Sequence, residues 1–380
     1  MGAPVAFDGL PAFDEAQWQV ELISRRERLR EIVHRAGCAA VVVFASPEHR
    51  QMFRYLTDFV PVIGDAWLIV SEQRQWAVTQ FSWQIDESRA ASGFEEWEAA
   101  YEPEDLVLDH VREALNGGSR IGVIGMQRLP HRMHVELSAR AELVDLGPAL
   151  ERERRVKTPL EVALLQRACA VTDRMLDRAR ELAAEPVTEL DIAAELSSVA
   201  LRDAEGLSFE SVVISGFEQA SAIRRPTSRR LREGDTVLLD IGAQYRGYQA
   251  DAGRSFVIGE PTAEQERYWA MVLEVAEELT ALAVPGTPAH RFHDIYAERL
   301  RKEGFDLRHR IGHGIGLATS FEWPSFEAGA QDELVAGMTI AIEPGVYRAG
   351  MGNLKLEENL LVTEGAPLLL SHAPRHLAVG

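Results

Sequence analysis

Cysteine is scarce in this chain, which has only Cys38 and Cys169 among its 380 residues. Two thiols so far apart in the sequence supply neither a disulfide framework nor a cysteine zinc site. We therefore expect two buried thiols in a protein of the reducing cytoplasm.

Long hydrophobic runs are also missing. No segment approaches the roughly 18 apolar residues that a transmembrane helix requires. Residues 1–14 have neither the basic start nor the apolar stretch of a signal peptide. Ala6 stands where a myristoylation signal has Ser or Thr. These absences predict a cytoplasmic protein without a membrane partner.

Basic residues are few relative to acidic ones, with 40 Lys and Arg against 59 Asp and Glu and a formal net charge of -19. Nucleic acids and anionic membranes bind clustered Lys and Arg side chains, so the composition argues against both kinds of partner. Acidic residues mostly keep a surface solvated, but some could bind a cation, and composition does not separate the two interpretations.

The length of the chain favours two domains, because 380 residues exceed what one hydrophobic core usually supports. The first part alternates a charged amphipathic stretch with short apolar runs and a polar, largely helical interval, which predicts a small α/β domain. The stretch covers 15–36, the apolar runs are 39–45, 66–70, 76–79 and 121–124, and the polar interval is 86–116.

A domain boundary is expected just before a long helix. Thr158 is a typical N-cap, Pro159 suits the first helical position and Glu161 completes a capping box. Similar start signals recur at Thr188, Thr262 and Thr287. We therefore predict an α+β protein with domains 1–155 and 156–380.

Two apolar runs, 236–242 and 248–258, flank a turn-like segment and predict an antiparallel hairpin. If the turn centres between Tyr245 and Arg246, Asp240 and Asp251 lie opposite each other. Two buried carboxylates would repel unless they share a proton or bind a cation. A metal ion is the simpler remedy.

The same pattern recurs near the C-terminus, where 338–343 and 354–362 flank a connection that contains Gly350 and Gly352. Glu343 and Glu357 can face each other in such a hairpin. His313 lies in a glycine-rich run, 312–316, which leaves its imidazole uncrowded. Singly, each of these residues could be a solvated or structural one. Together, one imidazole and four carboxylates suit two divalent ions.

Several segments that carry these residues resemble the ordered signature of the creatinase, aminopeptidase P and prolidase superfamily, the pita-bread metallopeptidases of family M24. They are 239–242 (LDIG), 251–255 (DAGRS), 309–316 (HRIGHGIG), 342–347 (IEPGVY), 355–358 (KLEE) and 374–377 (PRHL). The resemblance covers roughly residue 158 to the C-terminus. Residues 54–59 (RYLTDF) are similar to the N-terminal domain motif of the family, with Asp58 in place of Gly.

The resemblance implies a creatinase-type N-terminal domain followed by a pita-bread catalytic domain, commonly in a homodimer. It assigns a dinuclear metal site to Asp240, Asp251, His313, Glu343 and Glu357. Mn²⁺ is the first expectation, with Fe²⁺, Co²⁺ or Zn²⁺ as alternatives. Two such ions could activate water and polarise a carbonyl. Glu343 is then the expected proton shuttle, and His309 is expected beside the site, where a purely structural role is the alternative.

The chain departs from the family pattern at the two histidines that face the substrate. Ile223 occupies the first position and Ser320 the second, with Glu322 as a substitute that needs a shift in the alignment. Losing both imidazoles should weaken the stabilisation of an oxyanion. The remaining candidates for substrate contact are two arginines that could bind a carboxylate and a tryptophan ring that could stack. The alternative is that the arginines are solvated and the tryptophan belongs to the core. They are Arg224, Arg225 and Trp323.

Three functional hypotheses follow. The first is a metal-dependent hydrolase of an amide or peptide-like bond, by default an Xaa-Pro dipeptidase or aminopeptidase. The second keeps the fold but takes a non-peptide metabolite, in the manner of creatinase, ectoine hydrolase or the dimethylsulfoniopropionate lyases, and the departures at Ile223 and Ser320 favour it. The third is a non-catalytic binding protein, which the intact set of ligands argues against.

Overall fold

The computed structural model describes residues 10, 13–183, 186–218, 220–318 and 322–379. The chain divides into two compact units, Ala12–Arg154 and Arg155–Gly380. Each unit combines helices with sheets, which confirms the predicted α+β class. No helix in the described part of the chain is both long enough and apolar enough to cross a membrane.

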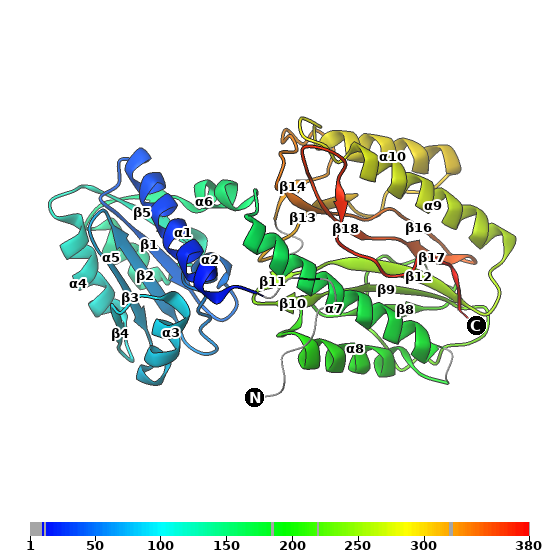
Figure 1. Ribbon diagram of the computed structural model, residues 1–380, viewed down its shortest axis with the longest axis horizontal. Coiled ribbons are helices and arrows are strands. Elements are labelled where there is room, and N and C mark those ends of the chain that lie inside the picture. Colours follow the sequence, from blue (N-terminus) through cyan, green and yellow to red (C-terminus); the bar gives the residue numbers. More distant parts are fainter. Residues whose placement is uncertain (1–9, 11–12, 184–185, 219, 319–321, 380) are drawn as a thin grey trace. The chain divides into compact units, whose positions relative to one another are not determined.

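The N-terminal unit is a six-stranded sheet in the order β4-β3-β2-β1-β5-β6, with α1 and α2 on one side and α4 and α5 on the other (Figure 1). The side chains of Ala40, Val42 and Phe44 form one core with residues of α4 and α5. The strands are β1 (Ala40–Ala45), β2 (Ala66–Ser71), β3 (Gln75–Thr79), β4 (Trp97–Ala99), β5 (Arg120–Ile124) and β6 (Glu142–Asp145). The helices are α1 (Glu15–Arg35), α2 (Gln51–Thr57), α3 (Ile85–Ser92), α4 (Glu104–Leu115), α5 (His131–Ser138) and α6 (Gly147–Arg154), with short 3-10 turns at Ser82–Gln84 and Met126–Arg128.

One detail of this unit differs from the sequence analysis and another explains a departure from the family motif. The interval predicted as largely helical contains β4, which pairs in parallel with β3 and buries Trp97. A strand of three residues between polar segments is too short to show an alternating pattern. Asp58 ends α2 with a φ of 54° and accepts a hydrogen bond from Trp18 Nε1 at 2.8 Å. It therefore adopts the left-handed conformation that Gly usually supplies at this point.

The first half of the C-terminal unit packs α7 (Pro159–Ala183) and α8 (Glu189–Asp203) on a four-stranded sheet in the order β20-β12-β9-β8 (Figure 1). The apolar face of α7, including Val171 and Met175, shares a core with Leu239 and Phe256 of the sheet. The strands are β8 (Val212–Ser215), β9 (Thr236–Ile241), β12 (Ala252–Ile258) and β20 (Ala378–Val379), and a small sheet adds β7 (Gly206–Leu207), β10 (Ala243–Tyr245) and β11 (Tyr248–Gln249).

The second half repeats this arrangement with α9 (Ala263–Leu282) and α10 (His290–Glu303), which share a core with a five-stranded sheet in the order β14-β13-β15-β18-β19. The strands are β13 (Gly312–Gly314), β14 (Glu322–Ser325), β15 (Thr339–Ile342), β18 (Glu358–Leu361) and β19 (Leu368–Leu369). A separate pair is formed by β16 (Gly345–Arg348) and β17 (Gly352–Lys355).

The predicted helix starts are mostly confirmed. Reciprocal side-chain and backbone hydrogen bonds of a capping box are present at Thr158, Thr188 and Thr262. Thr287 was expected to begin α10, but that helix begins at His290 and the Thr287 hydroxyl donates to the carbonyl of Leu282. The predicted burial of both thiols holds only for Cys169, because Cys38 is partly exposed.

The predicted hairpin of Asp240 and Asp251 is present, but the predicted register is wrong by two residues. Asp240 lies opposite Gly253, and the two-residue turn consists of Arg246 and Gly247, with φ values of 47° and 83°. Both central residues of a type I′ turn need a positive φ, and Gly247 accommodates one without strain. Because side chains alternate with a period of two, the shift leaves both aspartates on one face as a diagonal pair.

The second hairpin has the predicted register. Ile342 pairs with Glu358 in β15 and β18, and Gly345 pairs with Lys355 in β16 and β17. Both pairs belong to one continuous register, which places Glu343 and Glu357 opposite each other between the two ladders.

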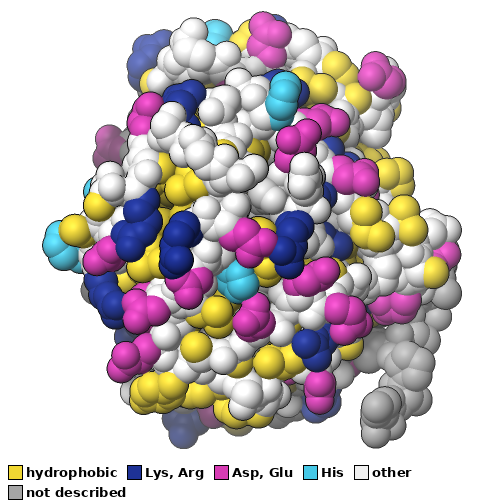
Figure 2. Space-filling view, turned by 90° about the vertical axis from the view of Figure 1, so that its left-hand side faces the viewer, with side chains coloured by type: hydrophobic (Ala, Val, Ile, Leu, Met, Phe, Trp, Pro, Cys, Tyr) yellow, Lys and Arg dark blue, Asp and Glu magenta, His cyan; other side chains and the backbone are white. Residues whose placement is uncertain are grey.

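The surface shows mixed charge: on the face drawn in Figure 2, acidic side chains lie among the basic ones.

Candidate active site

A cavity of about 570 Å³ lies within the C-terminal unit. All five side chains that were predicted to bind metal line it, namely Asp240, Asp251, His313, Glu343 and Glu357. The other lining residues come from the segments before and after β8 and from two basic positions, namely Phe209–Val212, Ile223–Arg225, Arg310 and Lys355. The two hairpins and the glycine-rich run therefore meet at one place.

Three of the predicted ligands are close enough to share one ion. Ligand atoms of Asp251, His313 and Glu357 all lie within 4.8 Å of one another, and the three side chains are buried. His313 Nδ1 is 3.0 Å from the carbonyl of Gly314, which only accepts, so this nitrogen carries the proton. The lone pair of Nε2 then faces Asp251 Oδ2 at 3.5 Å and Glu357 Oε1 at 4.0 Å. Burial lowers the pKa of His313, which favours the neutral ring that metals bind.

The carboxylates are crowded enough to perturb one another. Burial, followed by the charges of Glu357 and Asp240, raises the pKa of Asp251 well above its usual range. Burial and the neighbouring Glu343 raise the pKa of Glu357 to about 8, although Lys355 opposes the change. Ionised carboxylates that are buried close together repel each other, and a cation or a shared proton relieves this repulsion. A bound cation would therefore stabilise the ionised carboxylates of this site.

A single buried ammonium supplies part of that charge. Lys355 Nζ lies 2.7 Å from Asp240 Oδ2 and 2.9 Å from both Glu343 Oε2 and Glu357 Oε2. Burial would lower the pKa of Lys355, but the three carboxylates raise it well above its usual value. Glu357 Oε2 still accepts no hydrogen bond of acceptable geometry. Around this ammonium the donor set offers four carboxylates and one imidazole, which fits divalent cations.

Glu343 is the carboxylate that stays ionised most easily. Burial would raise its pKa, but Lys355, His309 and His313 lower it to about 2. His309 Nδ1 donates to the carbonyl of Arg310 at 2.7 Å, and His309 Nε2 accepts from the Tyr347 hydroxyl at 2.7 Å. His309 is not among the residues that line the cavity. Its contacts orient Tyr347 beside Glu343, and its catalytic role stays a prediction.

The predicted substrate contacts are placed unevenly. Arg224 and Arg225 line the cavity, but Arg224 forms an ion pair with Glu189 at 2.6 Å and Arg225 one with Glu210 at 3.1 Å. Ser320 lies outside the described residues.

Two other candidates are not brought to the cavity. The Glu322 carboxylate is 2.8 Å from Lys157 Nζ and accepts the backbone N–H of Leu317 at 2.8 Å, so it braces the chain after the glycine-rich run. The ring of Trp323 lies under the Arg155 guanidinium at 5.7 Å. Neither Glu322 nor Trp323 is among the lining residues.

Two site residues were missed by the sequence analysis. Lys355 could have been found from strand alternation, because Lys355 and Glu357 are two residues apart and share a face. Arg310 also lines the cavity, and its place in the family segment 309–316, between His309 and His313 in the sequence, was the available signal.

Comparison with known proteins identifies this arrangement. The profile of metallopeptidase family M24 matches residues 163–364, more than half of the chain. The chain belongs to metallopeptidase family M24. The profile of the creatinase/prolidase N-terminal domain matches residues 25–156. The predicted resemblance is confirmed: the chain is a metallohydrolase of this family, whose members use divalent metals, and Asp251, His313 and Glu357 form a buried group that could hold such an ion.

Individual relatives in the M24 family cover most of the chain. It is 25% identical over 357 residues to an Xaa-Pro dipeptidase of Pyrococcus horikoshii, covering 92% of this chain and 97% of the relative. It is 35% identical over 237 residues to a probable dipeptidase PepE of Mycobacterium tuberculosis, covering 60% and 62% of the two chains. The crystal structure of an X-Pro aminopeptidase of Thermotoga maritima superposes with a TM-score of 0.84 at 23% identity, covering 93% of this chain and 99% of that one, which shows the shared fold.

Proposed function

We propose that this chain cleaves the peptide bond before proline in small peptides, as an Xaa-Pro dipeptidase or aminopeptidase. The observation that carries the proposal is the convergence of all five predicted metal ligands on one cavity. The Pyrococcus horikoshii relative, an Xaa-Pro dipeptidase, supports the choice of substrate class.

Asp240, Asp251, His313, Glu343 and Glu357 would hold two divalent ions, with Mn²⁺ the first choice and Fe²⁺, Co²⁺ or Zn²⁺ the others. Bound ions of this kind activate water and polarise a carbonyl. Side chains of the protein would handle the proton and hold the carboxylates in place. Glu343 lines the cavity among the other ligands and would serve as the proton shuttle that the family resemblance implies. Lys355 would keep Asp240, Glu343 and Glu357 in fixed positions while the proton moves.

The basic side chains on the cavity wall suit the free carboxylate of a dipeptide. Arg310 and Arg225 both line the cavity, and a guanidinium can bind a carboxylate through two parallel hydrogen bonds. The metal ligands and these arginines belong to the same cavity, so a substrate of dipeptide size can contact both.

A non-peptide substrate is the second candidate, in the manner of the creatinase-like, ectoine hydrolase-like or dimethylsulfoniopropionate lyase-like enzymes. The observation that favours it is Ile223, which lines the cavity without a polar atom at a position where peptidases of this family carry a histidine. A purely non-catalytic role is disfavoured by the complete set of metal donors.

We also propose a homodimer, for which the N-terminal unit offers an apolar surface. Phe81 stacks on Trp83 with 5.4 Å between ring centroids and contacts Tyr101 edge-on at 6.1 Å. Trp83 and Tyr101 are 64% and 74% exposed, with Val62 and Ile63 also exposed nearby in the sequence. Exposed aromatic clusters of this kind commonly mark protein interfaces. The cytoplasmic location expected from the sequence stays a prediction.

Elemental analysis of protein purified without chelator, together with hydrolysis assays, tests the proposal. Wild type should contain about two divalent ions per chain and release proline from Xaa-Pro dipeptides. Asp251→Ala should lose both the metal and the activity, and Asp105→Ala, which changes an exposed aspartate of the N-terminal unit, should keep both. Bound metal without proline release from any dipeptide, but with hydrolysis of a small non-peptide amide, would support the second candidate. A chain that takes up no Mn²⁺, Co²⁺ or Zn²⁺ would refute both.

A further inference from the structure

One wall of the cavity is a connection rather than a strand. Residues 216–235 link β8 to β9, and Ile223, Arg224 and Arg225 of this connection line the cavity. Ile223 is 70% exposed and has Phe209 and Val212 as apolar neighbours in the cavity lining. The metal ligands lie in the rest of the lining, so the cavity has an acidic part and an apolar part.

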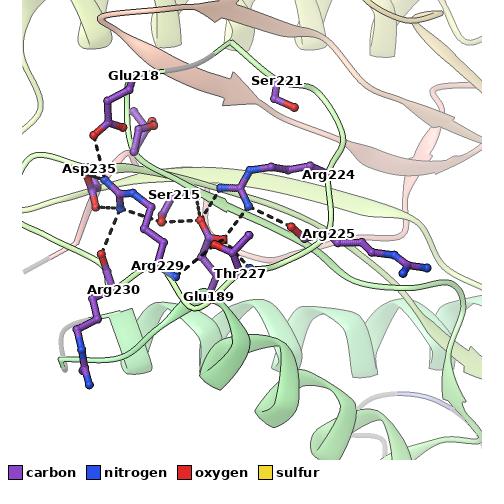
Figure 3. A network of polar contacts seen from close by, with 12 residues as sticks. Glu189, Ser215, Glu218, Ser221, Arg224, Arg225, Thr227, Arg229, Arg230 and Asp235 are labelled. Carbon is purple, nitrogen blue, oxygen red and sulfur yellow. Dashed lines mark hydrogen bonds and ion pairs between the residues drawn. The ribbon is translucent and has the colours of Figure 1, made fainter.

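A buried carboxylate outside the cavity lining holds this connection. Glu189, the first residue of α8, accepts six hydrogen bonds (Figure 3). Its Oε1 accepts from the Ser215 N–H at 2.7 Å, the Ser215 hydroxyl at 2.7 Å and Arg224 Nη2 at 2.6 Å. Its Oε2 accepts from Arg224 Nη1 at 2.7 Å, the Thr227 N–H at 2.9 Å and the Thr227 hydroxyl at 2.7 Å. One side chain therefore joins the end of β8 to both sides of the Arg225–Pro226 segment.

The backbone on each side of Ile223 is also held. Before it, the Ser221 N–H donates to Asn353 Oδ1 at 2.9 Å, and Ala220 and Ala222 pack against the core around Tyr347. After it, the N–H groups of Glu189 and Leu190 donate to the carbonyls of Arg229 and Thr227 at 3.1 and 3.2 Å. Between these anchors, the Ser221 hydroxyl donates to the Ile223 carbonyl at 3.2 Å, and Arg224, the next residue, is bound by Glu189, so both contacts help to position Ile223.

We propose that Glu189 is a positioning residue that fixes the connection through Arg224 and Thr227, and that Ile223, held in this way, determines specificity for substrates with an apolar side chain. The second part rests on the proposed function, because it names the class of dipeptide that the site takes. The side chain of Ile223 has no polar atom, so its favourable contact with a substrate is apolar. We assign this wall to the side chain of the first residue, because that is the apolar group that varies among Xaa-Pro dipeptides.

Limited trypsin digestion tests the positioning role without any assay of activity. The connection contains cleavable bonds after Arg224, Arg229, Arg230 and Arg232, whereas the bond after Arg225 precedes proline and resists trypsin. Glu189→Gln keeps the size of the side chain but loses the charge that binds Arg224. Cleavage after Arg224 should be at least about 10-fold faster in this variant than in wild type. Glu195→Gln, which changes a partly exposed glutamate of the same helix, should match wild type.

Arg224→Lys gives a second test of the same contact. A lysine keeps the charge but cannot form the two parallel bonds to Glu189. The bond after Arg229 is the same in all three proteins, and its cleavage should be slowest in wild type, faster in Arg224→Lys and fastest in Glu189→Gln. Mass spectrometry of the first fragment identifies the bond, and circular dichroism confirms that each variant is folded. Equal resistance of folded wild type, Glu189→Gln and Arg224→Lys would overturn the positioning role.

Kinetics with Gly-Pro and Leu-Pro test the specificity role. The ratio of kcat/KM for Leu-Pro over Gly-Pro should fall about 10-fold in Ile223→Ala, mainly through KM, with the metal content unchanged. Glu189→Gln should lower the same ratio, because the wall that makes the contact is no longer fixed.

If wild type cleaves neither dipeptide, calorimetric binding of Gly-Pro and Leu-Pro replaces the kinetics. Tighter binding of Leu-Pro that depends on Ile223 would support the specificity role and refute the proposed cleavage alone. An unchanged preference in Ile223→Ala, or no binding of either dipeptide, would overturn it.

Discussion

Replacing Lys355 by methionine should destabilise the metal-free protein strongly and the metal-loaded protein much less. The ammonium lies within 2.7 to 2.9 Å of the carboxylates of Asp240, Glu343 and Glu357 and is buried. Removing one partner from a buried ion pair costs about 3–5 kcal/mol, because the remaining charge is left without compensation. We expect a loss in this range in the metal-free protein, limited by protonation of Glu357, whose pKa is already raised to about 8.

Divalent ions should restore the stability that Lys355→Met loses, because their charge can replace that of the ammonium. Urea unfolding at pH 7.5 should show Lys355→Met gaining more from Mn²⁺ than wild type gains, after both proteins have been stripped with chelator. Lys302→Met is the matched control, since Lys302 is 60% exposed and its pair with Glu298 lies on the surface. Its stability should change by less than about 1 kcal/mol in either condition. A metal-free Lys355→Met protein as stable as wild type, or an equal gain from Mn²⁺, would refute this account of the site.

Two further predictions concern Glu189 and the exposed aromatic surface. Hydrogen bonds from Arg224, Ser215 and Thr227 outweigh burial and lower the pKa of Glu189 from 4.5 to about 2; wild type should therefore lose roughly 3 kcal/mol of stability as the pH falls through this range. Glu189→Gln should not show this loss. If the unfolding free energies of wild type and Glu189→Gln changed with pH in the same way, this prediction would be contradicted. Trp83→Ser should weaken the proposed homodimer and increase the fraction of monomer in light scattering at low concentration; an unchanged mass across the concentration range would exclude this surface as the interface.

The metal side of the cavity was largely predictable because it lies on regular structure. Two apolar runs around a turn predict a hairpin, and strand alternation then places carboxylates on a shared face. Asp240 and Asp251 show the limit of this reasoning, because the register depends on which residues of the turn adopt positive φ. The pattern did not reveal that Arg246 would take such a conformation before Gly247. An error of two residues kept the face and therefore kept the site.

The substrate side was not predictable in the same way. Arg224 was considered as a residue that binds a substrate carboxylate, but its guanidinium is bound by Glu189. Nothing in the local sequence links these two positions, which lie 35 residues apart. Glu189 looks like an ordinary acidic residue in the first turn of a helix, where negative charge is favourable for general reasons. Only the folded backbone brings Ser215, Arg224 and Thr227 to the same carboxylate.

This difference explains how the chain can keep metal chemistry and change its substrate. The ligands lie on or beside paired strands, so moving one of them disturbs the strand pairing and the core that the strands cover. Glu189, which does not line the cavity, holds the connection that carries Ile223. A substitution at position 223 leaves these hydrogen bonds in place. Selectivity can therefore evolve at the wall without loss of metal binding. By the same argument, Ile223→His should restore a proton donor to the cavity and leave the metal content unchanged.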